Sequence, residues 1–220
     1  MLSPERIEAA FNHTEWLRAA LHDKEISAAP RTRAAVACLG IAQEHHHSIV
    51  LLIDHKLNAT AYALLCVSLE SYVRGVWLAL CASDEQVAKF WAGDNPPGID
   101  AMLEQLERTP SFSEKFLSQI KGEHWGKLCG FTHTGGLQVQ RWNTETAIEP
   151  SYEPKEVAQV LFFVQLIGSL AVIGVAQIAN DDELAQRVLV QIKALPSVAK
   201  TLHRRATSGL RSTTAPHVKR

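Results

Sequence analysis

The sequence predicts an all-α protein, a helical bundle built around long antiparallel central helices. Apolar residues recur at the spacing of helices along most of the chain. Proline, asparagine and serine stand where the expected helices begin. No internal repeat and no β-rich region interrupts this pattern, and at 220 residues with 46% hydrophobic content the chain can bury a core of its own.

Two long helices dominate the first part of the chain after an opening helix. Pro4 suits a first helical turn, so we expect a helix from Pro4 to His22, which the segment ISAAP ends. A long helix is expected over residues 31–57. Another begins after Asn58 and runs to about residue 82.

Shorter helices are expected next. In SDEQVAKFWAG, Ser83 and Gln86 have the spacing of a capping box; the loop DNPPG follows, and IDAMLEQLER is again helical. A further helix is expected over 113–133, whereas LQVQRW (137–142) alternates and favours a short extended segment.

A long apolar helix opened by Pro154 runs to about residue 179, and two shorter helices are expected after it. The last residues, TSGLRSTTAPHVKR, show no core pattern. We therefore expect a single domain over residues 1–206 and a mobile basic tail over 207–220. From residue 181 onward eight Lys or Arg stand against three acidic residues. We expect a solvated helix face followed by a soluble tail, and the alternative is a second route to RNA.

Charge and cysteine usage narrow the class of protein. The net charge of −1 excludes a global basic field for nucleic acid. Cys38, Cys66, Cys81 and Cys129 form no C-x-x-C motif, which is typical of buried free thiols in a reducing compartment. The start, MLSPERIEAAF, lacks the apolar run of a signal peptide. These features together favour a cytoplasmic protein.

The stretch 157–179 contains no charged residue and is long enough to cross a bilayer. Glutamines and a serine are spread along it, and no aromatic belt marks both ends. We expect a central core or dimer helix, so the predicted assembly is a homodimer with this helix at or beside the interface. Membrane association is the disfavoured alternative.

Glu70 and Arg74 are the only charges between residues 58 and 82. Their spacing of four residues, with Glu first, is the favourable one for an ion pair on a helix. Two charges in an otherwise apolar helix are costly unless both are paired. They therefore form either a structural pair or part of a functional site.

Histidines supply the remaining candidates. His45, His46 and His47 are consecutive, so a helix turns them in three directions and they do not form a metal site. We expect a polar segment with one partly buried histidine, His46 or His47, and no metal or cofactor. In KLCGFTHTGG, His133 is expected in a last helical turn, with Gly135 as a cap that accepts a positive φ. The alternative is that His133 moves a proton near neutral pH.

The stretches SLESYVRGVWLALCASDEQVAKFW and LCGFTHTGG resemble bacterial proteins of the HEPN-like helical class, over about residues 30 to 180. HEPN domains are helical bundles that often form dimers. Many are metal-independent RNases of toxin or antiphage systems, and others bind ligands or partners without catalysis. Their signature is Arg, four to six residues, then His.

The matching place in this chain has lysine instead of arginine, with five residues between Lys127 and His133. Literal matches, Arg6 with His13 and Arg211 with His217, lie outside the expected helix. The resemblance implies RNA cleavage or RNA binding in a toxin or phage-defence setting, with an antitoxin or defence-system partner.

In the catalytic version of this hypothesis, His133 takes a proton from a ribose 2′-hydroxyl. Arg74 and Lys127 hold the phosphate, and Glu70 orients Arg74. The alternative is a non-catalytic interaction or ligand-binding module, in which Glu70, Arg74 and His133 form a polar network.

Overall fold

Helices follow one another along residues 2–195, the part of the chain that the computed structural model describes. Within this part there is no strand, and the β-type pairing consists of one isolated bridge between Asn143 and Ile148. The prediction of an all-α bundle is confirmed. The helices are α1 Pro4–Leu21, α2 Pro30–Asp54, α3 Asn58–Leu80, α4 Asp84–Trp91, α5 Ile99–Leu106, the 3₁₀ turn η1 Pro110–Phe112, α6 Phe116–Thr132, α7 Gly136–Gln140, α8 Pro154–Ile178 and α9 Asp182–Ala194.

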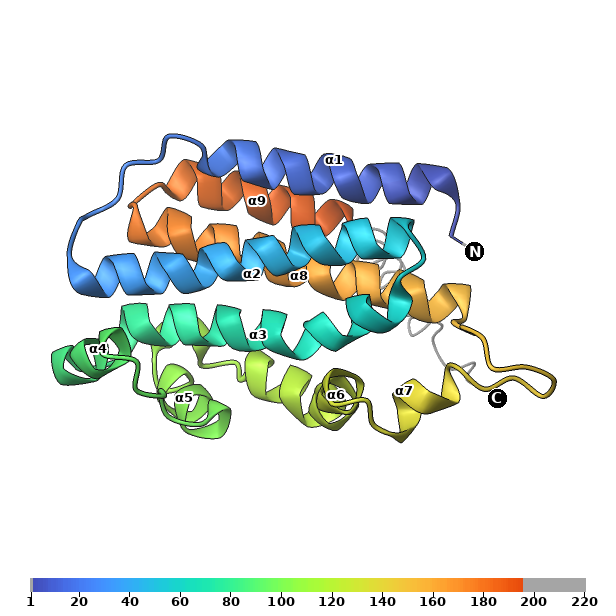
Figure 1. The fold of residues 1–220 in the computed structure, drawn as a ribbon. Helices are drawn as coiled ribbons and strands as arrows, with labels where there is room; N and C mark the ends of the chain where they lie inside the picture. Colours follow the sequence, from blue (N-terminus) through green and yellow to red (C-terminus); the bar gives the residue numbers. More distant parts are fainter. Residues whose placement is uncertain (1, 196–220) are drawn as a thin grey trace, which may run out of the picture.

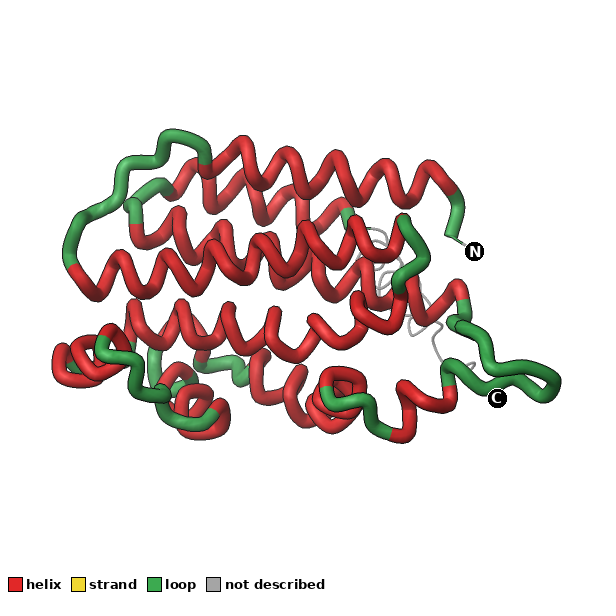
Figure 2. The backbone as a smooth tube through the Cα atoms, in the orientation of Figure 1, coloured by secondary structure: helices red, strands yellow, loops and turns green. Residues whose placement is uncertain are grey.

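Three long helices form the centre of the bundle, because α2, α3 and α8 pack against one another. Figure 1 shows α2 and α3 as an antiparallel pair, with α1 and α9 on one side and α4 to α7 on the other. Figure 2 shows the loops at the ends of the helices, with the longest excursion between α7 and α8. Trp77 of α3 is almost fully buried, and its Nε1 donates to Gln105 Oε1 of α5 at 2.9 Å, which joins the centre to the outer layer.

The α8 helix is covered largely by its own chain. Thirteen of its 25 residues are buried, and it packs against α1, α2, α3 and α9. This burial explains the charge-free stretch 157–178 of α8 without a second copy of the protein, so the homodimer remains a prediction.

By length and composition, α2, α3 and α8 could each cross a membrane. In the described part of the chain these same helices supply the mutual contacts of the bundle core. The apolar side chains of these three helices are therefore buried against one another in the core.

Most expected helices form within a few residues of their expected limits, but one expectation is wrong. Residues 137–142 are not extended, because Gly136–Gln140 form the short helix α7. The buried Gln138 side chain donates from Nε2 to the Ala59 carbonyl at 2.8 Å, and this contact with α3 anchors the turn. One of the two shorter helices expected at the end is α9; the second, like the tail 207–220, lies outside the described residues.

Candidate functional site

The α6 helix lies against α3 and runs antiparallel to it (Figure 1). Two contacts fix this pairing: Thr132 Oγ1 donates to the Ala63 carbonyl at 2.8 Å, and the sulfur atoms of Cys66 and Cys129 are 3.0 Å apart. Because the helices are antiparallel, the residues of α6 that precede Cys129 lie beside the later turns of α3. Those turns carry Glu70 and Arg74.

Glu70 and Arg74 are half-buried on the strip of α3 between α2 and α6. Burial raises the pKa of the Cys38 thiol on α2, and the nearby positive charge of Arg74 opposes that rise. Glu70 lies near Cys66, whose pKa it helps to raise. The pair therefore lies between the two neighbouring helices.

The expected ion pair between Glu70 and Arg74 does not form within the described residues, and no hydrogen bond from either side chain to those residues replaces it. The Nε atom of Arg74 is buried and has no hydrogen-bond partner there. A buried charged donor without an acceptor is costly. Arg74 thus has one enclosed donor that no acceptor in the described chain satisfies.

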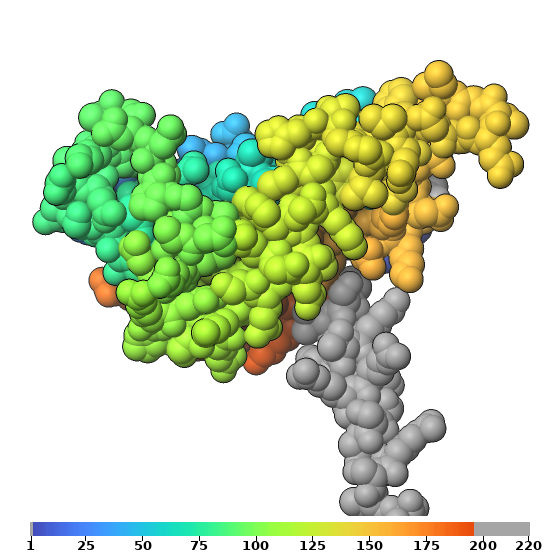
Figure 3. All heavy atoms as spheres, turned by 90° about the horizontal axis from the view of Figure 1, so that it is seen from below, coloured from blue at the N-terminus to red at the C-terminus, as the bar shows by residue number. Residues whose placement is uncertain are grey.

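A row of three glycines on α6 borders open space. Gly122, Gly126 and Gly130 are four residues apart, and a Cβ atom added at any of them would meet nothing within 4 Å. The space-filling view in Figure 3 shows a hollow between α4 and α6, at which atoms of α2 and α3 are visible. We call this strip of α3, between α2 and α6, the α3 recess.

His133 is the C-cap residue of α6 and is exposed. The helix ends in a Schellman motif, in which the Gly135 amide donates to the Gly130 carbonyl at 2.7 Å. The expectation of a positive φ at Gly135 is wrong: Thr134 has the positive φ of 52°, whereas Gly135 has a φ of −69°. Glycine is needed at 135 because an added Cβ would lie 2.9 Å from the Gly130 oxygen.

The four predicted site residues are not brought into one cluster. Thr132 contacts Ala63, so His133 lies near the beginning of α3, and Arg74 is eleven residues farther along, or about 16 Å at the helical rise. Lys127 is exposed and stands two residues from Cys129, a turn of about 200° away from the α3 contact. Glu70 and Arg74 share the recess, and the composite site that includes His133 stays a prediction.

Cys66 and Cys129 form a thiol pair that the sequence does not reveal. All four cysteines are free. Cys66 is buried and Cys129 is half-buried. Burial, followed by the hydrogen bond with Cys129, raises the pKa of Cys66 to about 12. The pair lies one helical turn before Glu70 on α3 and one turn before His133 on α6.

A second polar group missed from the sequence lies between α1, α2 and α8. His13 and His46 have ring centroids 6.1 Å apart. His13 Nε2 is 3.0 Å from Ser169 Oγ, and His46 Nε2 is 3.3 Å from Thr14 Oγ1. Both hydroxyls donate to backbone carbonyls, those of Gln165 and Ala10, so each oxygen accepts from a neutral histidine. This group is enclosed in the core and serves packing.

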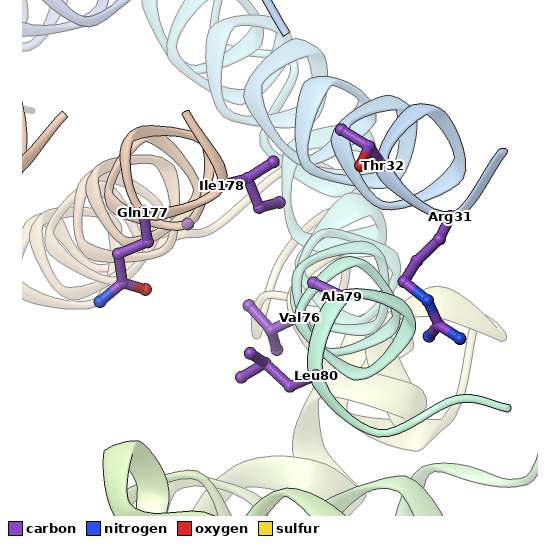
Figure 4. A pocket seen from close by; sticks show the side chains of 8 residues that line it. Arg31, Thr32, Val76, Ala79, Leu80, Gln177 and Ile178 are labelled. Atoms are coloured by element: carbon purple, nitrogen blue, oxygen red, sulfur yellow. The ribbon is translucent and has the colours of Figure 1, made fainter. Parts of the chain in front are cut away.

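A pocket of about 290 Å³ lies at the opposite end of the central helices from His133. Figure 4 shows Arg31 and Thr32 of α2 near Ala79 of α3 and Ile178 of α8. Arg31 is already engaged, because its Nη1 donates to the Leu78 carbonyl at 3.0 Å and its Nη2 to Asp84 Oδ1 at 2.6 Å. Arg31, the one charged residue among the described residues that line this pocket, therefore caps the C-terminal end of α3, and its hydrogen bonds are already made within the chain. Across residues 2–195, no group of three His, Cys, Asp or Glu is placed to hold a metal ion.

The model of DUF6988, described as a family of unknown function, matches residues 39–200. The matched range contains the α3 recess, His133, His46 and both cysteines of the thiol pair, and it leaves out α1 with His13. No curated protein and no solved structure matches the chain.

Proposed function

We propose that this chain, which belongs to DUF6988, a family of unknown function, is a HEPN-like helical module that binds RNA along the α3 recess. The proposal includes a cytoplasmic location, a homodimer and a toxin or phage-defence setting with its partner protein. These parts rest on the resemblance of the α3 and α6 sequences to HEPN-like proteins.

The observation that carries the proposal is the buried, unpartnered Nε of Arg74. An arginine fork pairs well with the oxygens of a phosphate, and a turn of the half-buried Arg74 side chain toward such a ligand would satisfy the buried donor. The α3 recess is an open hollow in the surface (Figure 3), which suits a chain of phosphates better than a small enclosed ligand. His133, exposed at the end of α6, supplies a further donor toward the strand as it leaves the recess, whereas Lys127 is turned away from α3.

The geometry supports binding better than cleavage by one protomer. Arg74 and His133 are separated by about 16 Å along α3, so they contact different phosphates of one strand. Cleavage requires the proton acceptor and the phosphate-binding group at the same linkage. In the catalytic version of the proposal, a second copy of the chain supplies the missing partner.

Replacing Arg74 with alanine is expected to weaken binding of a single-stranded RNA about tenfold, because one charge-assisted phosphate contact is lost. The slope of log affinity against log salt should become shallower by about 0.7. Fluorescence anisotropy with a labelled RNA at several salt concentrations measures both quantities. Arg18→Ala removes the same charge from α1, on the far side of the bundle, and should change neither. An unchanged affinity in Arg74→Ala would refute RNA binding at the recess.

His133→Ala tests the catalytic version. The side chain is exposed and makes no hydrogen bond within the described residues, so its loss should abolish any metal-independent RNA cleavage while leaving the Tm nearly unchanged. His124→Ala, at another exposed histidine of α6, is the matched control and should retain cleavage. If the wild-type protein binds RNA but does not cleave it, the catalytic version of the proposal is refuted and the binding version stands.

A further inference from the structure

The α3–α6 contact contains two thiols at the distance from which a disulfide forms with little movement. The sulfur atoms of Cys66 and Cys129 are 3.0 Å apart, and a disulfide bond is about 2.05 Å long, so closure requires about 1 Å of motion. The helices are held in register one turn away, where Thr132 Oγ1 donates to the Ala63 carbonyl. The fold therefore brings together two cysteines that are 63 residues apart in the chain.

We propose that Cys66 and Cys129 are a redox modification site, in which a hydroperoxide oxidises the pair to an intramolecular disulfide between α3 and α6. The thiol chemistry stands independently of RNA binding. Its consequence for ligand binding, a fixed position of α6 beside the recess, rests on the proposed function.

Cys66 and Cys129 differ in solvent exposure, and this difference indicates which of them reacts first with the hydroperoxide. Cys129 is half-buried and within reach of solvent, whereas Cys66 is 3% exposed. The thiolate of Cys129 attacks one oxygen of the hydroperoxide, the O–O bond breaks, and Cys129 becomes a sulfenic acid as hydroxide or alkoxide leaves. The sulfur of Cys66 then attacks the sulfenic sulfur. A disulfide forms, and the thiol proton leaves with the sulfenic hydroxyl as water.

Burial supports the role of Cys66 as the second thiol. Since the pKa of Cys66 is raised to about 12, it stays protonated at neutral pH and does not compete for the oxidant. Once Cys129 is oxidised, Cys66 is the neighbouring sulfur already in contact with it. The remaining cysteines, Cys38 and Cys81, are free and make no comparable contact within the described residues.

The test uses the full chain, treated with hydrogen peroxide at a small excess and then mapped by peptide mass spectrometry without reduction. A linked peptide pair containing Cys66 and Cys129 should appear, and the number of titratable thiols should fall from four to two. Dithiothreitol should reverse both changes. A linkage between other cysteines, a linkage between two chains, a sulfinic acid at Cys129 or unchanged thiols would each overturn the proposal.

Single variants test the order of the steps. In Cys66→Ser, a dimedone-type probe should label Cys129, because the sulfenic acid has no second thiol to attack it. In Cys129→Ser, Cys66 should stay unlabelled. Cys81→Ser, which removes a half-buried cysteine at the end of α3, is the matched control and should form the disulfide as wild type does. These experiments do not measure RNA binding. A negative result would therefore refute the disulfide proposal and leave the RNA-binding proposal untouched, and the reverse holds for the RNA-binding assays.

Discussion

Lowering the pH from 7 to 5 is expected to reduce the free energy of unfolding by about 2 kcal/mol through His46 alone. Burial, with smaller contributions from His13 and His47, lowers the pKa of His46 from 6.5 to about 3. Because the folded pKa lies below the unfolded one, the unfolded chain takes up the proton first. The stabilising contribution is complete above pH 6.5 and is lost as the pH falls toward 3.

The surroundings of His46 explain why its protonated form is unfavourable in the folded protein. The side chain is fully buried, and Nδ1, where the proton would bind, has no hydrogen-bond partner in the described chain. The groups that face it are His13 and Thr14 from α1 and Gly168 from α8, with His47 beside it on α2. None of them carries a negative charge that could compensate an imidazolium.

Urea unfolding at pH 7 and pH 5 measures the effect. His46→Leu removes the titrating group and should reduce the pH dependence by most of that amount. Burial also lowers the pKa of His13, so a smaller dependence of the same sign should remain. His55→Gln, at the exposed C-cap of α2, should behave as wild type does. Equal pH dependence in wild type and His46→Leu would refute the assignment to His46.

Gly168→Ala is expected to lower the free energy of unfolding by about 2–3 kcal/mol, although alanine is ordinarily the better helix residue. The added Cβ would overlap Nδ1 of His46 and lie 2.8 Å from Cγ of the same ring. That ring is fully enclosed and held by Thr14, so it has no free space into which to move.

Two comparisons isolate this contact. Gly40→Ala, on the open side of α2 with nothing within 4 Å of the added Cβ, should be stabilising by up to about 1 kcal/mol. In a His46→Ala background, Gly168→Ala should lose its penalty, because the methyl group then has room. A penalty that persists in that background would mean that another contact is responsible.

Helix positions were largely readable from local signals. The capping box of Ser83 and Gln86 forms as predicted, and the prolines Pro4 and Pro154 open α1 and α8. The prediction of an extended segment at 137–142 was wrong for a tertiary reason. The hydrogen bond from Gln138 to the Ala59 carbonyl of α3 stabilises the short helix α7, and the alternating pattern of these six residues does not reveal that contact. Sequence patterns therefore predict helices that are stabilised by neighbouring residues, and not those that depend on a contact with a distant part of the chain.

The site was only partly predictable for the same reason. Two charges in an apolar helix marked Glu70 and Arg74 correctly as unusual, but the absence of an ion pair between them depends on side-chain directions. The thiol pair and the histidine group arise from contacts 63 and 156 residues apart, which no spacing rule describes. His46 was one of three adjacent histidines, and only the packing of α8 against α2 determines which of them is buried.

The docking of α1 on α8 has a consequence for biosynthesis. His13 meets its partner Ser169 only after 156 further residues have been made, which takes roughly 8–30 seconds at ordinary translation rates. The hairpin of α2 and α3 is complete long before α8 leaves the ribosome. Until then, the apolar faces of α2 and α3 that pack against α8 are exposed to solvent. The nascent chain is therefore expected to depend on holding chaperones, and synonymous codons that slow translation between α3 and α8 should increase its aggregation in the cell.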